Sequence, residues 1–128
     1  MPIKVLVADD SAILRHAIRN VLATRPEIEI VGEAANFAQA IQMANALTPH
    51  VIVMDLHMPD SNSVNPLSVK SQLNRGARTL AISIWTDEDA QALAWMLGAV
   101  TLLDKAKLAS TLIPAIVQSP SHINAAAA

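Results

Sequence analysis

Three aspartates follow apolar segments in a way that could build an acidic, cation-binding site. The run Val51–Met54 is continuously apolar and leads directly into Asp55, after which Met58-Pro59 turns the chain away. A first apolar run, residues 3–8, leads in the same manner into Asp9-Asp10. Carboxylates that lie close together need a cation among them, and a hard, oxygen-binding ion such as Mg²⁺ is the natural one.

Strands and helices alternate along the chain that must position these aspartates. Apolar or alternating runs predict the strands, and a four-residue spacing of apolar side chains predicts the helices between them. The expected strands are 3–8, 27–34, 51–54, 79–84 and 100–103. The expected helices run from Ser11 to a stop at Arg25-Pro26, from Asn36 to Leu47, over 66–73, from Thr86 to Gly98 and over 108–118.

This order of elements predicts an α/β fold with a doubly wound parallel sheet. Residues 51–54 are apolar throughout, as in a strand covered on both faces, whereas residues 27–34 alternate, as in an edge strand. Right-handed crossovers with one reversal of winding bring the ends of the first and third strands together. Asp9, Asp10 and Asp55 are therefore expected to meet at one edge of the sheet.

Local signals predict where the helices begin, end and face the core. Ser11 and Asn36 are expected to cap two helices, Thr86 with Asp89 resembles a capping box, and Gly98 should end the fourth helix. Pro114 is expected near the start of the last helix. The expected buried faces are Ile13, Leu14, Ala17, Ile18, Val21 and Leu22, then Phe37, Ala40, Ile41, Ala44 and Leu47, then Ala90, Leu93, Ala94 and Leu97.

Composition narrows the function classes. At 128 residues the chain is predicted to form one domain with a substantial core. Hydrophobic residues make up 52% of it and aromatic residues 2%, which favours a core of aliphatic side chains. A net charge of −2 without a Lys/Arg cluster argues against a nucleic-acid partner. Cysteine is absent and no apolar run reaches the ~18 residues of a membrane span, so a cytoplasmic protein without disulfides is expected.

Five motifs at expected strand ends resemble those of receiver domains of two-component response regulators, over roughly residues 3–118. They are Asp9-Asp10-Ser11, the segment Met54–Pro59, Ser83, Gly98-Ala99 and Lys105. The resemblance implies a CheY-like, flavodoxin-like (βα)5 fold with strand order 2-1-3-4-5 and helices on both faces. It also implies a receiver domain over 1–118 and a linker or tail over 119–128. The four terminal alanines could be an artificial addition.

The resemblance assigns a role to each residue of the acidic site. Asp10, Asp55 and the backbone carbonyl of His57 would bind Mg²⁺ (or Mn²⁺) directly, and Asp9 would act mainly through water. Asp55 would be the phosphoacceptor and form an acyl phosphate. Lys105 and Ser83 would then bind phosphoryl oxygens, with Ser83 moving inward as a switch. The implied protein is a phosphoacceptor rather than an enzyme, although it would take phosphate from small donors and lose it by hydrolysis.

The same resemblance extends to the rim of the site and to an output surface. His57, Ile84 and Trp85 occupy positions that tune dephosphorylation in this family, and their bulk predicts slow loss of phosphate. Leu102 replaces the aromatic switch residue that is frequent on the fifth strand. With Trp95 and Met96 it could form an apolar patch on the helix 4–strand 5–helix 5 face, for homodimers or partner docking. The implied phosphate source is a sensor histidine kinase or phosphotransfer protein.

Other interpretations remain open at this stage. Taken singly, Asp9, Asp10 and Asp55 could be helix caps or loop residues, Ser83 a small core residue and Lys105 a solvated lysine. The chain could be the receiver half of a truncated LuxR-type DNA-binding regulator, since Ala106 stands where proline is common and Ser119-Pro120-Ser121 suits a linker. It could also be a degenerate receiver that acts as an interaction module without phosphorylation.

Two other protein classes fit less well. A haloacid-dehalogenase-like phosphatase needs a second aspartate where this chain has His57. A Rossmann-type nucleotide-binding module needs a glycine-rich turn after the first strand, which is missing here. The kinase, the output and the oligomeric state cannot be predicted from the sequence.

Overall fold

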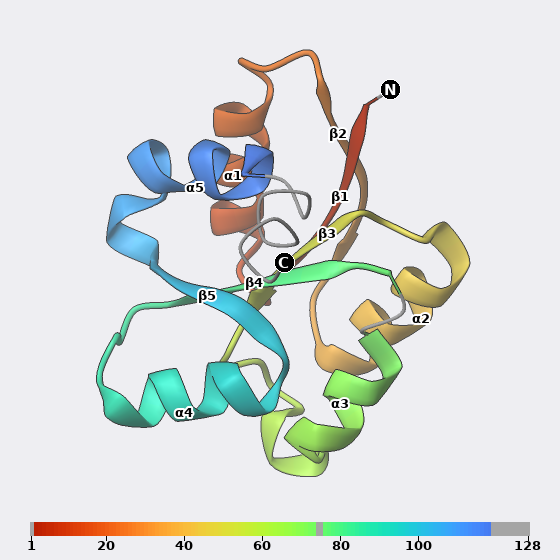
Figure 1. The fold of residues 1–128 in the computed structure, drawn as a ribbon, viewed down its shortest axis with the longest axis vertical. Helices are drawn as coiled ribbons and strands as arrows, with labels where there is room; N and C mark the ends of the chain where they lie inside the picture. Colours follow the sequence, from red (N-terminus) through yellow and green to blue (C-terminus); the bar gives the residue numbers. More distant parts are fainter. Residues whose placement is uncertain (1, 74–75, 119–128) are drawn as a thin grey trace, which may run out of the picture.

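Five parallel strands form one sheet in the order β2-β1-β3-β4-β5, which confirms the predicted fold (Figure 1). The computed structural model describes residues 2–73 and 76–118. The strands are β1 Ile3–Ala8, β2 Ile28–Ala34, β3 Val51–Asp55, β4 Arg78–Ser83 and β5 Ala99–Asp104. The helices are α1 Ala12–Leu22, α2 Phe37–Leu47, α3 Pro66–Leu73, α4 Glu88–Met96 and α5 Leu108–Val117, with short 3₁₀ turns at Ser61–Ser63 and Lys105–Lys107.

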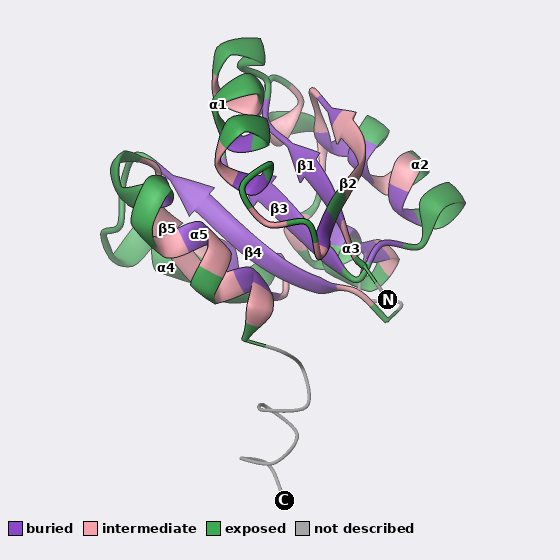
Figure 2. Ribbon diagram, turned by 90° about the horizontal axis from the view of Figure 1, so that it is seen from above, coloured by how far each residue is buried: buried purple, intermediate pink, exposed green. Residues whose placement is uncertain are grey.

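Helices cover both faces of the sheet, so its central strands are buried (Figure 2). Ile52 and Met54 of β3 belong to a core cluster shared with α2, α3 and α4. Val51 and Val53, on the opposite face of the same strand, belong to a second cluster shared with α1 and α5. This two-sided burial is the reason why β3 is apolar at every position before Asp55.

The strand β2 lies at an edge of the sheet, as its alternating sequence predicted.

The pairing between β1 and β3 determines where the acidic residues lie. Ala8 lies opposite Met54 in this parallel register, so Asp9 and Asp55 are the next residues along two adjacent strands. Both side chains therefore leave the sheet at its carboxyl edge, where ligands bind in doubly wound folds.

Several helix ends agree with the predictions made from the sequence, and the cap of α4 differs. The Ser11 hydroxyl accepts a hydrogen bond from the Leu14 N–H, the Asn36 side chain accepts one from Gln39, and Gly98 ends α4 at a φ of 83°. The predicted Thr86–Asp89 capping box is wrong. Asp87 caps α4 instead, because its carboxylate accepts a hydrogen bond from the Ala90 N–H.

Pro114 lies inside α5 rather than near its start. The prediction was wrong because α5 begins at Leu108, directly after the turn at Lys105–Lys107, and most of the helix precedes the proline. Proline has no N–H to donate to the preceding turn, but its carbonyl oxygen still accepts a hydrogen bond from the Gln118 N–H at 3.0 Å. The helix therefore continues past the proline to Val117.

Three side chains of the predicted buried faces are exposed. Ile13 of α1 is 85% exposed, Leu47 of α2 is 36% exposed and Ala17 of α1 is exposed as well, whereas Ile18, Leu22 and Phe37 lie in the core. Ile13 and Leu47 lie near a helix end, where a residue can fit the apolar spacing and still extend past the sheet. Within the described part of the chain, none of the helices has the length and apolar character needed to span a bilayer.

Candidate functional site

The structure brings together the three carboxylates that the sequence singled out. One carboxylate oxygen from each of Asp9, Asp10 and Asp55 lies within 4.8 Å of the others. Asp9 and Asp55 are buried and Asp10 is exposed. The cluster thus has a buried floor and one carboxylate open to solvent.

Lys105 lies between the two buried carboxylates. Its Nζ atom is 2.9 Å from Asp9 Oδ2 and 3.2 Å from Asp55 Oδ1. The lysine follows β5 directly, and Asp104 fixes this turn by accepting a hydrogen bond from the Ala106 N–H. Burial lowers the pKa of Lys105, but the hydrogen bond to Asp9 and the charges of both aspartates outweigh it and hold the pKa above its ordinary value. The lysine is therefore a fixed positive charge at the base of the site.

One lysine does not balance the negative charge around Asp55. Burial and the charge of Asp9 raise the pKa of Asp55 from 3.8 to about 6, although the His57 N–H and Lys105 act in the opposite direction. Asp55 Oδ1 accepts the hydrogen bond from His57, at 3.2 Å. Asp55 Oδ2 is buried and has no hydrogen-bond partner among the described residues. A carboxylate oxygen left in this condition favours a further positive group in the site.

The donor set fits a hard divalent cation. Three carboxylates supply only oxygen ligands, one of them is exposed, and Asp55 Oδ2 has no hydrogen-bond partner among the described residues. Mg²⁺ and Mn²⁺ prefer such oxygen ligands and keep part of their water shell, which the exposed side at Asp10 permits. The described residues therefore fit such an ion.

Ser83 lies at the end of β4, next to the site, but its hydroxyl has another partner. The residue is fully buried, and its Oγ accepts a hydrogen bond from the Trp85 N–H at 3.0 Å. No hydrogen bond of Ser83 to Asp55 or Lys105 is present among the described residues. The structure thus places Ser83 beside the acidic cluster without joining it to the cluster.

Three bulky residues form the exposed rim. The rings of His57 and Trp85 meet edge to face, with centroids 5.2 Å apart and planes at 84°. Trp85 is 54% exposed and Ile84 is 62% exposed. Since these residues follow Asp55 and Ser83 closely in the chain, the rim is attached to both strand ends that form the site.

Two of the three residues expected on the output surface are exposed, and the third is not. Trp95 is 76% exposed and Met96 39%, while Leu102 is half-buried and packs against the core. Trp95 and Leu102 both line a cavity of about 320 Å³ between α4 and β5. The structure therefore brings Trp95 and Leu102 together and gives Leu102 a role in the core as well.

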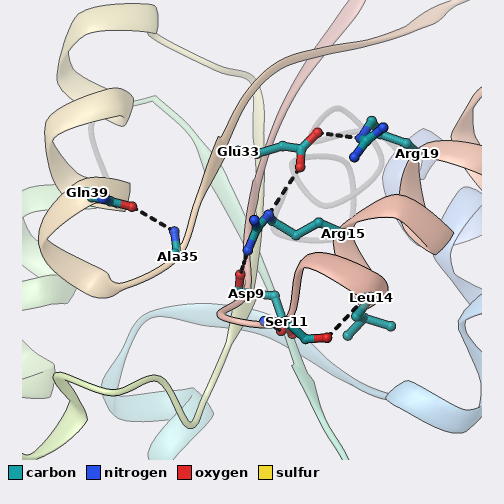
Figure 3. Close-up of polar contacts among 8 residues, drawn as sticks. All are labelled: Asp9, Ser11, Leu14, Arg15, Arg19, Glu33, Ala35 and Gln39. Atoms are coloured by element: carbon teal, nitrogen blue, oxygen red, sulfur yellow. Dashed lines mark hydrogen bonds and ion pairs between the residues drawn. The ribbon is translucent and has the colours of Figure 1, made fainter.

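Asp60 and Arg15 make polar contacts between elements that no local sequence pattern indicates. The Asp60 carboxylate accepts hydrogen bonds from the N–H groups of Phe37 and Ala38, at 3.0 and 3.1 Å. Arg15 donates to the Asp9 carbonyl at 2.6 Å and to Glu33 at 3.1 Å (Figure 3). Sequence analysis missed both, because the partners lie on different elements and only the fold brings them together.

Comparisons with known proteins agree with this geometry. The chain is 38% identical over 104 residues to a protein-glutamate methylesterase/protein-glutamine glutaminase of Anaeromyxobacter dehalogenans, which covers 81% of this chain and 30% of that protein. It is 30% identical over 118 residues to the nitrate/nitrite response regulator protein NarL of Escherichia coli, covering 92% of this chain and 55% of that protein. The chain thus spans about a third to a half of these relatives.

A solved structure and a family model also match this chain. The response regulator domain of Thermotoga maritima CheB matches with a TM-score of 0.78 at 29% identity, covering 93% of this chain and 96% of that one. The family model described as response regulator receiver domain matches residues 5–117. The domain boundary at residue 118 stays a prediction, since residues 119–128, with Ser119-Pro120-Ser121, lie outside the described residues. The chain belongs to the response regulator receiver domain family.

Proposed function

We propose that this chain is a phosphoacceptor switch that is phosphorylated on Asp55 in a Mg²⁺-dependent reaction. The observation that carries the proposal is the buried Asp55 of the acidic cluster, whose Oδ2 has no hydrogen-bond partner among the described residues and whose pKa is raised to about 6 by burial and by the charge of Asp9. A carboxylate held in this way attacks a phosphorus atom once a cation favours its ionised form. Bound Mg²⁺ (or Mn²⁺) would supply that charge and neutralise the phosphoryl oxygens.

Different residues would bind the cation and take part in transfer of the phosphoryl group. Asp10, Asp55 and the backbone carbonyl of His57 would hold a bound cation directly, and Asp9 would act mainly through water. An Asp55 oxygen forms the bond to phosphorus, and the donor's leaving group departs with the electron pair of the bond that breaks. Lys105, already 3.2 Å from Asp55, exchanges its carboxylate contact for a phosphoryl oxygen.

Ser83 serves as the switch residue in this proposal. Its hydroxyl gives up the hydrogen bond from the Trp85 N–H and donates to a phosphoryl oxygen. Trp85 moves with it, since it lies two residues after Ser83, the last residue of β4. The population then shifts toward a second arrangement of the β4–α4 connection, which changes the surface around Trp95, Met96 and Leu102.

The rim residues His57, Ile84 and Trp85 control how long the phosphoryl group lasts. Their exposed side chains stand beside the strand ends from which a hydrolytic water has to approach. We propose that they slow this approach, so that the phosphorylated form is long-lived. Phosphate is then lost by hydrolysis of the acyl phosphate at Asp55 within the same chain, and we propose no further catalytic activity.

Membership of the receiver family supports the partners that we propose. A sensor histidine kinase or phosphotransfer protein supplies phosphate in the cytoplasm, and a homodimer through the α4–β5–α5 face is the proposed output. We propose no nucleic-acid or membrane contact for this chain itself. The second candidate, the receiver half of a LuxR-type DNA-binding regulator, is supported by the match to the response regulator NarL, of which this chain covers 55%.

Intact-mass analysis after incubation with acetyl phosphate tests the proposal. We expect one added phosphoryl group with Mg²⁺, none with a chelator and none in Asp55→Asn. Asp89→Asn, which changes an aspartate of α4 outside the acidic cluster, should be modified like the wild type. No modification despite measured Mg²⁺ binding would instead identify a degenerate receiver that acts as an interaction module.

A further inference from the structure

We propose that Arg15 is a positioning residue of the cation site, which fixes the peptide unit between Asp9 and Asp10. This inference rests on the proposed metal-binding function of the acidic cluster. Arg15 Nη1 donates to the carbonyl oxygen of Asp9 at 2.6 Å. Its Nε atom donates to Glu33 Oε1 of β2 at 3.1 Å, so a single guanidinium joins the site to the edge strand (Figure 3).

Glu33 is itself held from a second side. Its Oε2 atom lies 2.6 Å from Arg19 Nε, one turn further along α1. The side chains of Arg15 and Glu33 are 19% and 27% exposed, which reduces the screening of their charges by solvent. The guanidinium is rigid and planar, so Glu33 fixes the direction in which Arg15 Nη1 points.

The orientation of the Asp9 carbonyl determines the backbone position from which the Asp10 side chain extends. The Asp9 carbonyl and the Asp10 N–H belong to one planar peptide unit, so fixing the oxygen fixes the plane. Asp9 is already held at its N–H by Ala34 O and at Oδ1 by the Ser11 N–H, at 2.9 and 2.8 Å. The carboxylate of Asp10 has no hydrogen bond or ion pair with any described residue. Its direction toward the cluster therefore depends on the backbone that Arg15 holds.

A positioning role and a simple charge effect predict opposite results. A positive guanidinium near a cation site repels the cation, so removing it should strengthen Mg²⁺ binding if Arg15 acts only as a charge. If Arg15 positions the Asp9–Asp10 peptide, its loss should weaken Mg²⁺ binding in spite of that gain. Arg19 provides the matched control, because it binds the same Glu33 without contacting Asp9.

The test is calorimetric titration of the unphosphorylated protein with Mg²⁺ at one pH and ionic strength. We expect Arg15→Met to raise the Kd for Mg²⁺ by about tenfold, the size of effect seen when a group that orients a metal ligand is lost. Arg19→Met loosens Glu33 but leaves the hydrogen bond from Arg15 to the Asp9 carbonyl, so it should raise the Kd by much less than Arg15→Met. At saturating Mg²⁺, phosphorylation of Arg15→Met by acetyl phosphate should regain the wild-type rate.

Arg15→Lys keeps the charge and tests geometry alone. A lysine has one nitrogen, which cannot hold the fork between Asp9 and Glu33, so the Kd for Mg²⁺ should again rise. Arg15→Lys also tests the proposal if Arg15→Met fails to fold, and circular dichroism would detect such a failure. The proposal is overturned if both Arg15 variants bind Mg²⁺ as tightly as the wild type, or if Arg19→Met weakens binding equally. A wild-type protein that binds no Mg²⁺ would overturn the metal site itself, together with this inference.

Discussion

Asp60 and Phe37 lie 23 positions apart in the sequence, yet the Asp60 carboxylate accepts a hydrogen bond from the Phe37 N–H at 3.0 Å. A second bond, from the Ala38 N–H at 3.1 Å, occupies the other oxygen. The loop after β3 thereby caps the N-terminus of α2, where free N–H groups favour a negative charge.

We expect Asp60→Ala to lower the free energy of unfolding by about 1 to 2 kcal/mol, because it removes both acceptors and the charge at the helix terminus. Asp60→Asn, which keeps one acceptor, should cost less. Urea denaturation followed by circular dichroism measures both changes. Ser61→Ala, at the next position, is the control, and equal midpoints for Asp60→Ala and the wild type would contradict the prediction.

The raised pKa of Asp55 predicts a pH dependence of stability in the absence of Mg²⁺. The folded protein keeps the Asp55 proton up to about pH 6, whereas the ordinary pKa is 3.8. Between these values the folded state binds more protons than the unfolded state, so the free energy of unfolding falls as the pH rises. With about 1.4 kcal/mol for each unit of pKa, the loss at Asp55 amounts to about 3 kcal/mol above pH 6.

Asp55→Asn should remove this loss, since the amide is neutral at every pH. In a chelator we expect the stability of the variant relative to the wild type to increase by about 2 kcal/mol between pH 4.5 and pH 7.5. Urea denaturation at the two pH values measures the difference. A difference that stays the same at the two pH values would show that Lys105 already balances the carboxylate.

The sheet and the acidic cluster could be predicted because both depend on local sequence. An apolar run such as Val51–Met54 identifies a buried strand, and in a parallel sheet the strand ends share one edge, which brought Asp9 and Asp55 together. The predicted strand order is confirmed by the structure.

Contacts between elements could not be predicted in the same way. The pair of Arg15 with Glu33 and the cap of α2 by Asp60 require knowledge of which helix lies beside which loop. The α4 cap at Asp87 was missed by one position, because several polar residues in sequence can each supply a cap and only the backbone selects one.

The exposed Ile84 beside Ser83 predicts an effect on the lifetime of phosphorylated Asp55. We expect Ile84→Ala to shorten this lifetime severalfold, because a smaller side chain opens the approach of water to the phosphoryl group. The measurement is the decay of the phosphorylated mass after removal of acetyl phosphate. Leu67→Ala, which truncates an exposed leucine on α3, should decay at the wild-type rate. A longer lifetime in Ile84→Ala would argue against the proposed rim.

The exposed Trp95 predicts an effect on association. If the α4–β5–α5 face is the output surface, Trp95→Ala should abolish any dimer that forms on phosphorylation, since a large aromatic side chain contributes strongly to an interface. Sedimentation of the protein before and after acetyl phosphate measures this. Ile13→Ala, an exposed apolar residue on α1, is the control. Unchanged association in Trp95→Ala would exclude the patch from the interface.

The two tryptophans of the chain stand at opposite ends of the proposed switch. Trp85 meets the ring of His57 at the rim of the site, whereas Trp95 points outward from α4 beside Leu102. Each is therefore a built-in optical probe of one end. Trp95→Phe leaves fluorescence that reports the rim, and Trp85→Phe leaves fluorescence that reports the outer face. The order in which the two signals change after mixing would show whether the site or the surface rearranges first.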